Sequence, residues 1–466
     1  MKIYFYPFLF AAIICSNTFS IQAKETVNDI TQLNPVVVDK VIAPTSTEEI
    51  SKLVASHDGP ISIGGGRYSQ GGQTATEDCL FIDMRNFNRI IKLDKENKLI
   101  TVQPGITWRK IQEAIDPEGL SMKIMQSYSN FTVGGSLSVN VHGRYIGQGS
   151  IIRSVKSIKL IMADGAIKSA SRTENPELFY AAIGGYGGIG IIVEATLELV
   201  DNRPIERSAQ KMPVTKYKDF FFKNIRNSKT AVFHNADLYP PYYSRVNAVT
   251  WSLTDKPVTI TDKLAPQKTL SSFDQSILKW VSDGPGGKTF REYVLDPYRY
   301  SDNSVVWRNY EASYDVISLE PASRDKSTYV LQEYFIPVEH FDEFAPKLAD
   351  ILRRNQVNVL NVSIRHALPD TESLLSWSPT EVFSFVIYYE QGTTDEDKKA
   401  VALWTNELID AALSERGTYY LPYQIIASKE QFLKAYPGSQ KYFALKEKVD
   451  PTYKFRNKLW DRYYSE

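Results

Sequence analysis

The stretch that decides the fold is Ile61-Ser62-Ile63-Gly64-Gly65-Gly66-Arg67-Tyr68-Ser69-Gln70-Gly71-Gly72. It begins as a short apolar strand and continues as a loop in which five of nine residues are glycine. Because glycine has no Cβ, such a loop can adopt positive φ angles and bring its backbone N–H groups close to a ligand. A phosphate is the usual ligand for a concavity of amides. The alternative is an ordinary surface loop, since a single glycine motif often matches by chance.

Two further glycine clusters favour the ligand-binding interpretation. The first is Thr132-Val133-Gly134-Gly135-Ser136, and the second is Gly184-Gly185-Tyr186-Gly187-Gly188-Ile189-Gly190. Each lies near an apolar run that is typical of a strand. Three glycine loops in one chain indicate a single extended cofactor.

Length and composition set the broad class of the protein. At 466 residues the chain is longer than one hydrophobic core usually serves, which predicts two domains. Basic and acidic residues both number 54, so the overall charge gives no support for binding to nucleic acid or to an anionic membrane surface. The 28 tyrosines and 22 phenylalanines fit a strand-rich protein with a ring-lined cleft.

Residues 1–23 are expected to be a secretory signal peptide that lies outside the fold. Lys2 gives a basic start, an apolar run begins at Tyr4, and small and polar residues lead to Ala23. The apolar run is too short to span a bilayer. We expect cleavage after Ala23, with Ser20 as the alternative. The mature protein is then exported, periplasmic or secreted, and has no integral membrane segment.

Cysteine and histidine give no sign of a metal site. Once the signal peptide is removed, Cys79 is the only cysteine, so no intramolecular disulfide can form. We expect Cys79 to be a small buried hydrophobic residue. The five histidines show no metal-ligand spacing: His57, His142, His234, His340 and His366.

The first half of the chain alternates between strand and helix patterns. A helix is expected to begin at Thr45-Ser46-Thr47-Glu48-Glu49, where a hydroxyl cap precedes acids that complement the helix dipole. Further helices are expected at Trp108–Ile115 and 177–183. The expected strands are 36–38, 61–63, 80–83, 99–102, 157–162 and 191–200.

The second half has a different pattern. Residues 255–300 read as irregular, and two strand–helix–strand units follow them. Pro346 is expected to kink or split the first of the two helices, because proline lacks the N–H and crowds the preceding turn. Such units predict an antiparallel sheet backed by helices. The expected strands are 329–335, 357–364, 383–389 and 419–421, and the expected helices are 338–353 and 394–413.

The first half resembles the FAD-binding domain of the vanillyl-alcohol oxidase / p-cresol methylhydroxylase (PCMH-type) superfamily. The resemblance rests on motifs in one order: Ala43–Ile50, the first glycine loop, Val102–Gly105, Thr132–Gly135, Asn140–Gly143, Ala163–Gly165 and Gly190–Ile192. It implies an α+β fold with a two-subdomain PCMH-type FAD-binding domain at 33–202. A substrate (cap) domain with an antiparallel sheet follows at 203–426, and a C-terminal segment at 427–466 packs back on the FAD-binding domain. The cap resembles that of the aldonolactone oxidase, alditol oxidase and decaprenylphosphoryl-ribose oxidase branch.

The resemblance also implies FAD as the cofactor. The residues that would hold its pyrophosphate are Gly64, Gly65, Gly66, Arg67, Tyr68 and Ser69, helped by Gly134, Gly135 and Ser136, while Gly190 and Ile192 would lie beside the adenine and ribose. Many relatives carry a histidine just after the first glycines, and the flavin is covalently attached to it. This chain has Arg67 there, or Tyr68 on a one-residue shift, so we expect FAD to be held non-covalently. Arg67 could bind a phosphate through its fork of donors; the alternative is a solvated loop arginine.

Oxidation of a carbon that bears a hydroxyl needs a group that takes the hydroxyl proton and groups that orient the C–H bond toward flavin N5. The resemblance implies that Glu333 points at the substrate from a cap strand. It places Arg365 where relatives have an acid-x-arginine pair, with Ser363 in place of the acid. The alternative for both charges is an exposed strand position.

Two candidates for the proton acceptor remain open. Relatives place a lysine on the last cap strand, where this chain has Tyr423. A phenol whose pKa is depressed can accept a proton. The other candidate is His142, beside the second glycine loop, although it could instead fix that loop by hydrogen bonds.

The expected function is oxidation of a CH–OH group by an FAD-dependent enzyme similar to D-arabinono-1,4-lactone oxidase. The substrate would be a sugar, sugar lactone, polyol or sugar-lipid, and the electron acceptor is open. One alternative is an exported FAD-binding protein that lacks turnover and serves as a binding or assembly component. Another is oxidation of a phenol or a cytokinin-like amine, which uses the same FAD-binding domain with a different cap.

Overall fold

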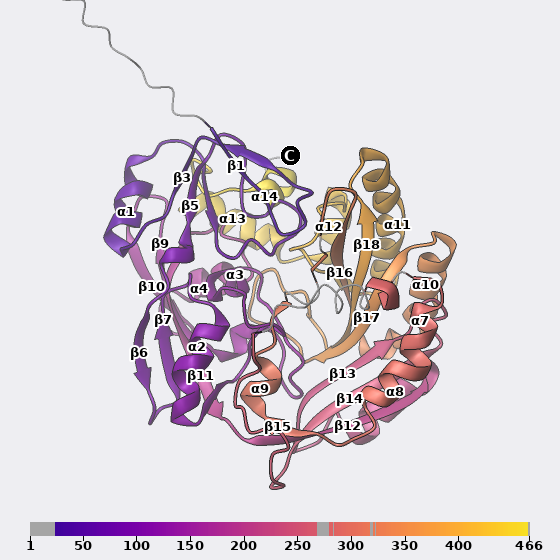
Figure 1. Cartoon of the computed structure of the whole chain (residues 1–466). Helices are drawn as coiled ribbons and strands as arrows, with labels where there is room; N and C mark the ends of the chain where they lie inside the picture. The colour runs from indigo at the N-terminus through magenta and orange to yellow at the C-terminus, as the bar shows by residue number, and fades with distance from the viewer. Residues whose placement is uncertain (1–23, 268–278, 283, 317–319, 322, 465–466) are drawn as a thin grey trace, which may run out of the picture.

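The computed structural model describes residues 24–464 except 268–278, 283, 317–319 and 322. The segment 1–23, where a signal peptide is expected, therefore lies outside the described residues. Figure 1 shows the N-terminal half of the chain on the left and a large sheet on the right. The backbone passes from one to the other between β11 and β12, at residues 201–204.

The first glycine loop follows a strand of a small parallel sheet. The order of this sheet is β3-β5-β4, and the helix α1 connects β3 to β4. Ser46 caps this helix by accepting the Glu49 N–H, and Ile50 and Val54 turn into the core. β4 ends at Gly64, where the glycine loop begins. The bounds are β3 Lys40–Ile42, α1 Thr47–Ser56, β4 Ile61–Gly64 and β5 Leu80–Asp83, with a separate hairpin of β1 Glu25–Val27 and β2 Val36–Val38.

The second sheet of this half is antiparallel. Its order is β10-β9-β11-β7-β6, and β8 pairs with β11 beyond β7. Its strands are β6 Ile90–Asp94, β7 Leu99–Val102, β8 Leu120–Met122, β9 Val155–Ile161, β10 Ile167–Ser171 and β11 Ile191–Asp201. The helices of this half are α2 Trp108–Ile115, α3 Val133–Ser138 and α4 Pro176–Ala182. The strands and helices predicted here are confirmed to within two residues, and Cys79 is confirmed as buried.

The second half is built on one antiparallel sheet of order β15-β12-β14-β13-β17-β18-β16-β19. Figure 1 shows α10 and α11 on its outer, right-hand side, away from the N-terminal half. The strands are β12 Pro204–Pro213, β13 Ala231–Leu238, β14 Arg245–Leu253, β15 Val305–Trp307, β16 Ser327–Pro337, β17 Asn358–Ala367, β18 Val382–Gly392 and β19 Thr418–Tyr419. The helices are α5 Tyr217–Asn224, α9 Arg308–Ala312, α10 Phe341–Arg354 and α11 Asp395–Ser414.

Strand alternation gives this sheet two different faces. On β16, Gln332 points outward, where its amide donates to Thr405 of α11 over 2.7 Å. Tyr334 points the same way and packs its ring against Phe344 of α10. Because successive side chains of a strand point to opposite faces, Glu333 points inward, toward the N-terminal half. The antiparallel cap sheet backed by helices is therefore confirmed.

Two predictions about the second half need correction. Pro346 was expected to kink or split its helix, and the split is absent, because α10 runs unbroken from Phe341 to Arg354. Pro346 lies on the exposed side, so water can satisfy the carbonyl that loses its partner, while the buried side packs on the sheet. Residues 287–299, expected to be irregular, form one helical run of α7 Gly287–Phe290, a π-helical turn η5 Arg291–Leu295 and α8 Asp296–Arg299.

The C-terminal segment returns to the glycine loops. Phe455 forms a parallel bridge with Ile61 of β4. The fully buried Lys446 donates to the carbonyls of Gly188 and Phe455, each over 2.7 Å, and pairs with Asp450 at 3.0 Å. Burial lowers the pKa of Lys446 to about 8. The tail thus supports the first and third glycine clusters; its helices are α12 Lys429–Ala435, α13 Ser439–Val449 and α14 Lys458–Tyr463.

Candidate active site

A cavity of about 450 Å³ lies between the glycine loops and the inner face of the eight-stranded sheet. Its wall in the N-terminal half includes Gly65, Gly66, Arg67, Tyr68, Ser69, Ser127, Tyr128, Gly134, Gly135, Ser136, His142, Gly190 and Ile192. Its wall on the sheet includes Tyr329, Leu331 and Glu333 of β16, Asn361, Ser363 and Arg365 of β17, and Val386 and Tyr388 of β18, followed by Tyr420 and Tyr423. The spacing of two along each strand brings these side chains to one face.

The first glycine loop is pressed against Thr132, at the start of the second loop. A Cβ on Gly65 would lie 2.4 Å from the Thr132 hydroxyl, and a Cβ on Gly66 would lie 2.9 Å from the Tyr68 ring. Gly64 differs, because it is not part of the cavity wall and a Cβ there would lie 2.2 Å from the Phe81 ring. Gly64 is therefore needed for packing on Phe81, while Gly65 and Gly66 let the backbone form the wall.

The second and third loops are built in the same way. A Cβ on Gly134 would lie 2.7 Å from Pro104, and a Cβ on Gly190 would lie 2.8 Å from the Ile161 carbonyl. The Ser136 hydroxyl is already paired, because it accepts from the Trp108 indole N–H. The wall between the loops is thus mainly backbone and small side chains, which leaves room for a flat or extended ligand.

The structure rules out one of the two roles considered for Arg67 from the sequence. Its φ is +60°, and its guanidinium pairs with Asp83 at 3.0 Å and lies over the Phe81 ring. It is 22% exposed, so it is not a solvated loop arginine. Asp83 also pairs with Arg85 at 2.6 Å, so two guanidinium groups share one carboxylate, and Arg67 Nε on the cavity wall has no protein partner. A contact between Arg67 and a phosphate therefore stays a prediction. Sequence could not show the pairing with Asp83, because Asp83 lies at the end of a different strand.

The cavity wall fits an extended cofactor such as FAD. One side of the wall is long and lined with glycine. Three buried polar atoms of the wall as a whole have no protein partner: the Ser127 hydroxyl, Arg67 Nε and Arg365 Nε. Buried polar groups are normally hydrogen-bonded, so atoms of this kind on a cavity wall indicate a ligand. Gly65, Gly66, Gly134 and Gly135 would hold its phosphates.

His142 and Glu333 meet across the boundary between the two halves. His142 Nε2 lies 2.6 Å from Glu333 Oε1, and the two residues are only 4% and 3% exposed. Ser384 Oγ donates to the same carboxylate oxygen over 2.5 Å. Burial alone would raise the pKa of Glu333, but the charges of His142 and Arg365 and the bond from Ser384 outweigh it and lower this pKa.

The hydrogen bonds of His142 show whether one of its ring nitrogens is available to accept a proton from a substrate. Its Nδ1 donates to the Gly143 carbonyl over 3.2 Å, and its Nε2 is held by Glu333. Neither ring nitrogen has a lone pair that faces the cavity, so the role of holding other groups in place is favoured over that of proton acceptor.

The premise that the Tyr423 pKa is depressed is wrong. Burial first, and then the negative charge of Glu333, raise it well above its ordinary value. The Tyr423 hydroxyl is within hydrogen-bonding reach of Glu333, the buried acid of the site. Tyr423 therefore stays protonated and can donate to Glu333, and its oxygen can still accept a proton from a neighbour in the cavity.

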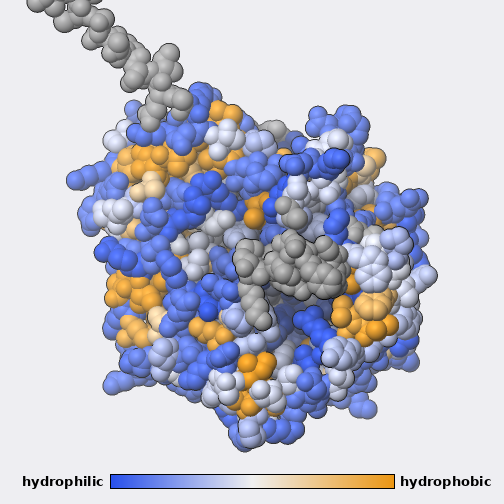
Figure 2. Space-filling model, in the orientation of Figure 1, coloured by the Kyte–Doolittle hydropathy of each residue, from blue (hydrophilic) through white to orange (hydrophobic). Residues whose placement is uncertain are grey.

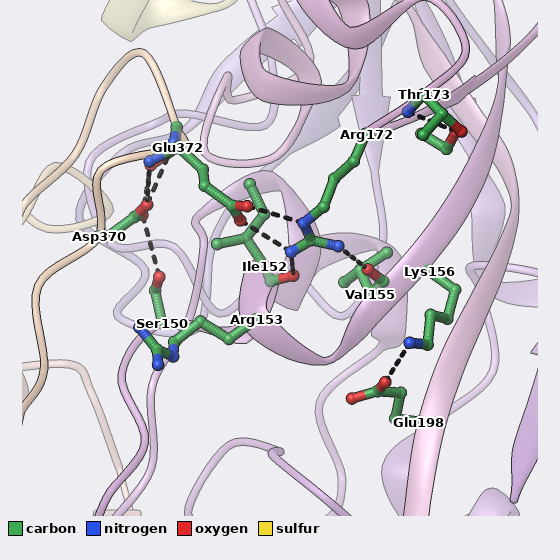
Figure 3. A network of polar contacts seen from close by, with 12 residues as sticks. Ser150, Ile152, Arg153, Val155, Lys156, Arg172, Thr173, Glu198, Asp370 and Glu372 are labelled. Carbon is green, nitrogen blue, oxygen red and sulfur yellow. Dashed lines mark hydrogen bonds and ion pairs between the residues drawn. The ribbon is translucent and has the colours of Figure 1, made fainter.

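A loop between β17 and β18 fixes the segment that carries His142. Asp370 accepts from the side chains of Asn140 and Ser150, over 2.7 and 3.0 Å. Figure 3 shows Asp370 beside Ser150, and next to it Glu372 facing the guanidinium of Arg172, with two N–O distances of 2.7 Å. Ionic contacts of this kind anchor the loop on the N-terminal half.

Trp377 of the same loop contacts both the Asn140 backbone and the His142 side chain. Its indole N–H donates to the Asn140 carbonyl over 2.9 Å, and its ring lies 4.8 Å from the His142 ring. Sequence reasoning missed Trp377 and Ser384. Ser384 had one visible signal, because it is a lone hydroxyl inside the aromatic run Phe383-Ser384-Phe385.

Comparison with known proteins identifies the first half. Residues 38–171 match the family described as FAD binding domain. The chain is 24% identical over 436 residues to L-gulonolactone oxidase of Bos taurus, which covers 90% of this chain and 94% of that protein. It is 23% identical over 414 residues to decaprenylphosphoryl-beta-D-ribose oxidase of Mycolicibacterium smegmatis, covering 84% of this chain and 86% of the relative.

A solved structure gives the same result for the fold. A solvent-stable cholesterol oxidase superposes with a TM-score of 0.73 at 16% identity, over 94% of this chain and 97% of that chain. The predicted α+β fold, with an FAD-binding domain before a substrate domain, is confirmed, and so is FAD as the cofactor. Within the described residues, no group of His, Cys, Asp and Glu is arranged to hold a metal ion.

Proposed function

We propose that this protein is an FAD-dependent oxidoreductase that oxidises a CH–OH group of a sugar, sugar lactone, polyol or sugar-lipid. The observation that carries the proposal is the buried Glu333, which combines a lowered pKa with a place on the wall opposite the glycine loops. An ionised carboxylate beside a phenol and an arginine suits removal of a hydroxyl proton. Two relatives that align with the chain over most of their length, an L-gulonolactone oxidase and a decaprenylphosphoryl-beta-D-ribose oxidase, support this class of substrate.

When bound, FAD supplies the hydride acceptor at flavin N5. Tyr423 accepts the proton of the substrate hydroxyl and passes its own proton to Glu333, so the phenol acts as a relay and the carboxylate as the final acceptor. Arg365 holds a substrate oxygen through its unpaired Nε, and its charge lies near Glu333. His142 and Ser384 hold the Glu333 carboxylate in place.

We further propose that FAD is held without a covalent bond. Arg67 stands where many relatives carry the linking histidine, and its guanidinium is engaged by Asp83. His142 is the only histidine of the cavity wall among the described residues, and both of its ring nitrogens are hydrogen-bonded. Export after removal of residues 1–23 is also part of the proposal.

The test is reduction of the purified yellow protein by a panel of substrates without oxygen. Aldonolactones, alditols, free sugars and a phenol are mixed with it in turn, and the flavin absorbance band is followed. Bleaching by a lactone or polyol is the expected result. Bleaching by the phenol alone would contradict the substrate class. A protein that holds FAD and bleaches with none of them would be a binding protein without turnover.

A further inference from the structure

The first glycine loop ends in two buried glutamines that the proposed function does not use. Gln70 and Gln73 are 6% and 5% exposed, and both lie on the cavity wall. Figure 2 shows hydrophilic, blue residues over much of the outer face, where water can bond a polar side chain. An amide inside the protein needs partners from the chain itself. The partners of these two glutamines lie in the segments that carry Tyr423 and Glu333.

Gln73 fixes the backbone of the segment that carries Tyr423. Its Nε2 donates to the carbonyl oxygens of Leu421 and Tyr423, over 2.7 and 2.6 Å. Its Oε1 accepts from the Gly71 N–H over 2.8 Å. An amide NH₂ has two donors, so both of them are used to hold residues 421–423 against the glycine loop.

Gln70 holds the strand that carries Glu333. Its side-chain oxygen accepts from the Leu331 N–H of β16 over 2.8 Å. The Glu333 carbonyl, two residues further along the same edge, accepts from the Tyr420 N–H over 2.9 Å. The Gln70 amide thus takes the place that a neighbouring strand would have beyond β19. The backbone N–H of Gln70 also donates to the Pro422 carbonyl over 2.6 Å.

The glycine loop and the segment 421–424 meet too closely for a side chain at Gly71. A Cβ on Gly71 would lie 2.4 Å from the Tyr423 carbonyl oxygen. Gly71 does not have a positive φ, so the close contact, and not the backbone conformation, requires glycine here. Residues 70–73 and 421–424 therefore form one packed unit, which we call the glutamine junction.

The glutamine junction connects the two parts of the proposed chemistry. Residues 65–69 of the same loop lie on the wall that would hold the FAD phosphates. Tyr423 and Glu333, on the other side of the junction, form the proposed proton path. A displacement of a reacting group by about 1 Å is enough to slow a reaction by about 10²-fold. The backbone position of Tyr423 relative to the loop therefore matters for the rate.

We propose that Gln73 is a positioning residue, which holds the Tyr423 backbone at a fixed place relative to the cofactor loop. The hydrogen bonds of its side chain go to backbone groups, so Gln73 acts through Tyr423 and takes no proton itself. The inference rests on the proposed function, in which Tyr423 relays the proton of the substrate hydroxyl.

The first experiment compares Gln73→Glu with the wild type in stopped-flow reduction of the flavin without oxygen. The lactone or polyol that bleaches the wild type is the substrate. A carboxylate keeps the shape and the acceptor for the Gly71 N–H but loses both donors. We expect the FAD content and the half-saturating substrate concentration to stay unchanged, while the limiting rate falls by about 10- to 100-fold. An unchanged limiting rate would overturn the proposal.

Gln332→Glu is the matched control. Gln332 is 4% exposed, donates to the hydroxyls of Tyr389 and Thr405, and accepts from the Tyr334 hydroxyl. It thus makes the same number of side-chain hydrogen bonds as Gln73, but on the outer face of β16 and outside the cavity wall. This variant should lower the unfolding midpoint and leave the limiting rate unchanged. Equal slowing in both variants would show a general loss of stability and would overturn the proposal.

The double variant Gln73→Glu/Tyr423→Phe tests whether Gln73 acts through Tyr423. If it does, the double variant should reduce no more slowly than Tyr423→Phe alone, because effects of residues that act as a unit do not add. A further slowing of about tenfold or more would place the effect elsewhere and would overturn the proposal.

Amide hydrogen exchange of the FAD-bound protein separates this inference from the proposed function, because it needs no substrate. Gln73→Glu should speed exchange in the peptide that contains residues 420–426, and Gln332→Glu should not. Unchanged exchange in that peptide would overturn the proposal. Faster exchange in a protein whose Tyr423→Phe variant reduces at the wild-type rate would refute the relay and leave Gln73 as the residue that holds the segment.

Discussion

Glu333→Gln tests the proposed proton path most sharply, because it removes a charge and keeps the shape. In the wild type, Glu333 accepts from His142 over 2.6 Å and from Ser384 over 2.5 Å. Both contacts are made to one oxygen, Oε1, so in the variant the amide oxygen can take its place and accept from the His142 Nε2–H and from Ser384. Both hydrogen bonds persist, so we expect the free energy of unfolding to fall by no more than about 1 kcal/mol.

The chemical effect of Glu333→Gln should be far larger, because an amide cannot take the proton that Tyr423 passes on. We expect the rate of flavin reduction by substrate to fall by about 10²- to 10⁴-fold, the usual share of a general base. Stopped-flow mixing without oxygen measures this rate, and the absorbance of released flavin gives the FAD content. The control is Ser384→Ala, which removes one hydrogen bond to Glu333 and keeps its charge, so the rate should fall by no more than about tenfold. A flavin-replete Glu333→Gln protein that reduces at the wild-type rate would refute the reasoning.

The lowered pKa of Glu333 gives the same variant a pH signature. A carboxyl whose folded pKa lies below its unfolded value stabilises the fold above the unfolded value, 4.5, and loses this contribution as pH falls through the folded pKa. The stability difference between wild type and Glu333→Gln should therefore be constant above pH 4.5 and shrink in more acidic solution. Urea titrations at several pH values measure it, and a difference that shrinks near neutral pH would contradict the lowered pKa.

Four further predictions follow from the site and its support. Tyr423→Phe should keep FAD and slow flavin reduction by about 10²- to 10⁴-fold in the same stopped-flow assay, because the relay loses its oxygen; an unchanged rate would exclude the relay. Gly65→Asp should abolish FAD binding, since its Cβ would lie 2.4 Å from the Thr132 hydroxyl and its charge would repel the pyrophosphate; normal FAD absorbance in a folded variant would show that this loop does not hold the phosphates. Acid precipitation should release all FAD into the supernatant, because Arg67 stands in place of a linking histidine; flavin left on the polypeptide would disprove non-covalent binding. The pKa of Lys446 is lowered to about 8 from 10.5, so the unfolded state binds more protons between these values and stability should rise with pH there by up to about 1.4 kcal/mol per unit; Lys446→Met, compared in urea titrations, should lose that rise, and an equal slope in both proteins would mean that the lysine titrates normally.

Local features of the sequence were enough to predict most of the fold. The cap at Ser46, the glycine loop after β4 and the period of two along β16 each depend on residues close together in the chain. The same period could place Glu333 and Arg365 on cap strands, and the ordered motifs of the N-terminal half led to FAD. Pro346 shows the limit of this reasoning, because whether a proline splits a helix depends on which side of the helix faces water.

Only the tertiary structure decided how the site residues act. His142 and Glu333 are 191 positions apart and Asn140 and Asp370 are 230 apart, so no local pattern could pair them. The pKa of Tyr423 moves up instead of down because burial and a neighbouring carboxylate determine its sign, and both come from packing. Side-chain periodicity and backbone conformation are properties of neighbouring residues and can be read from the sequence, whereas desolvation and charge pairing arise when distant segments meet.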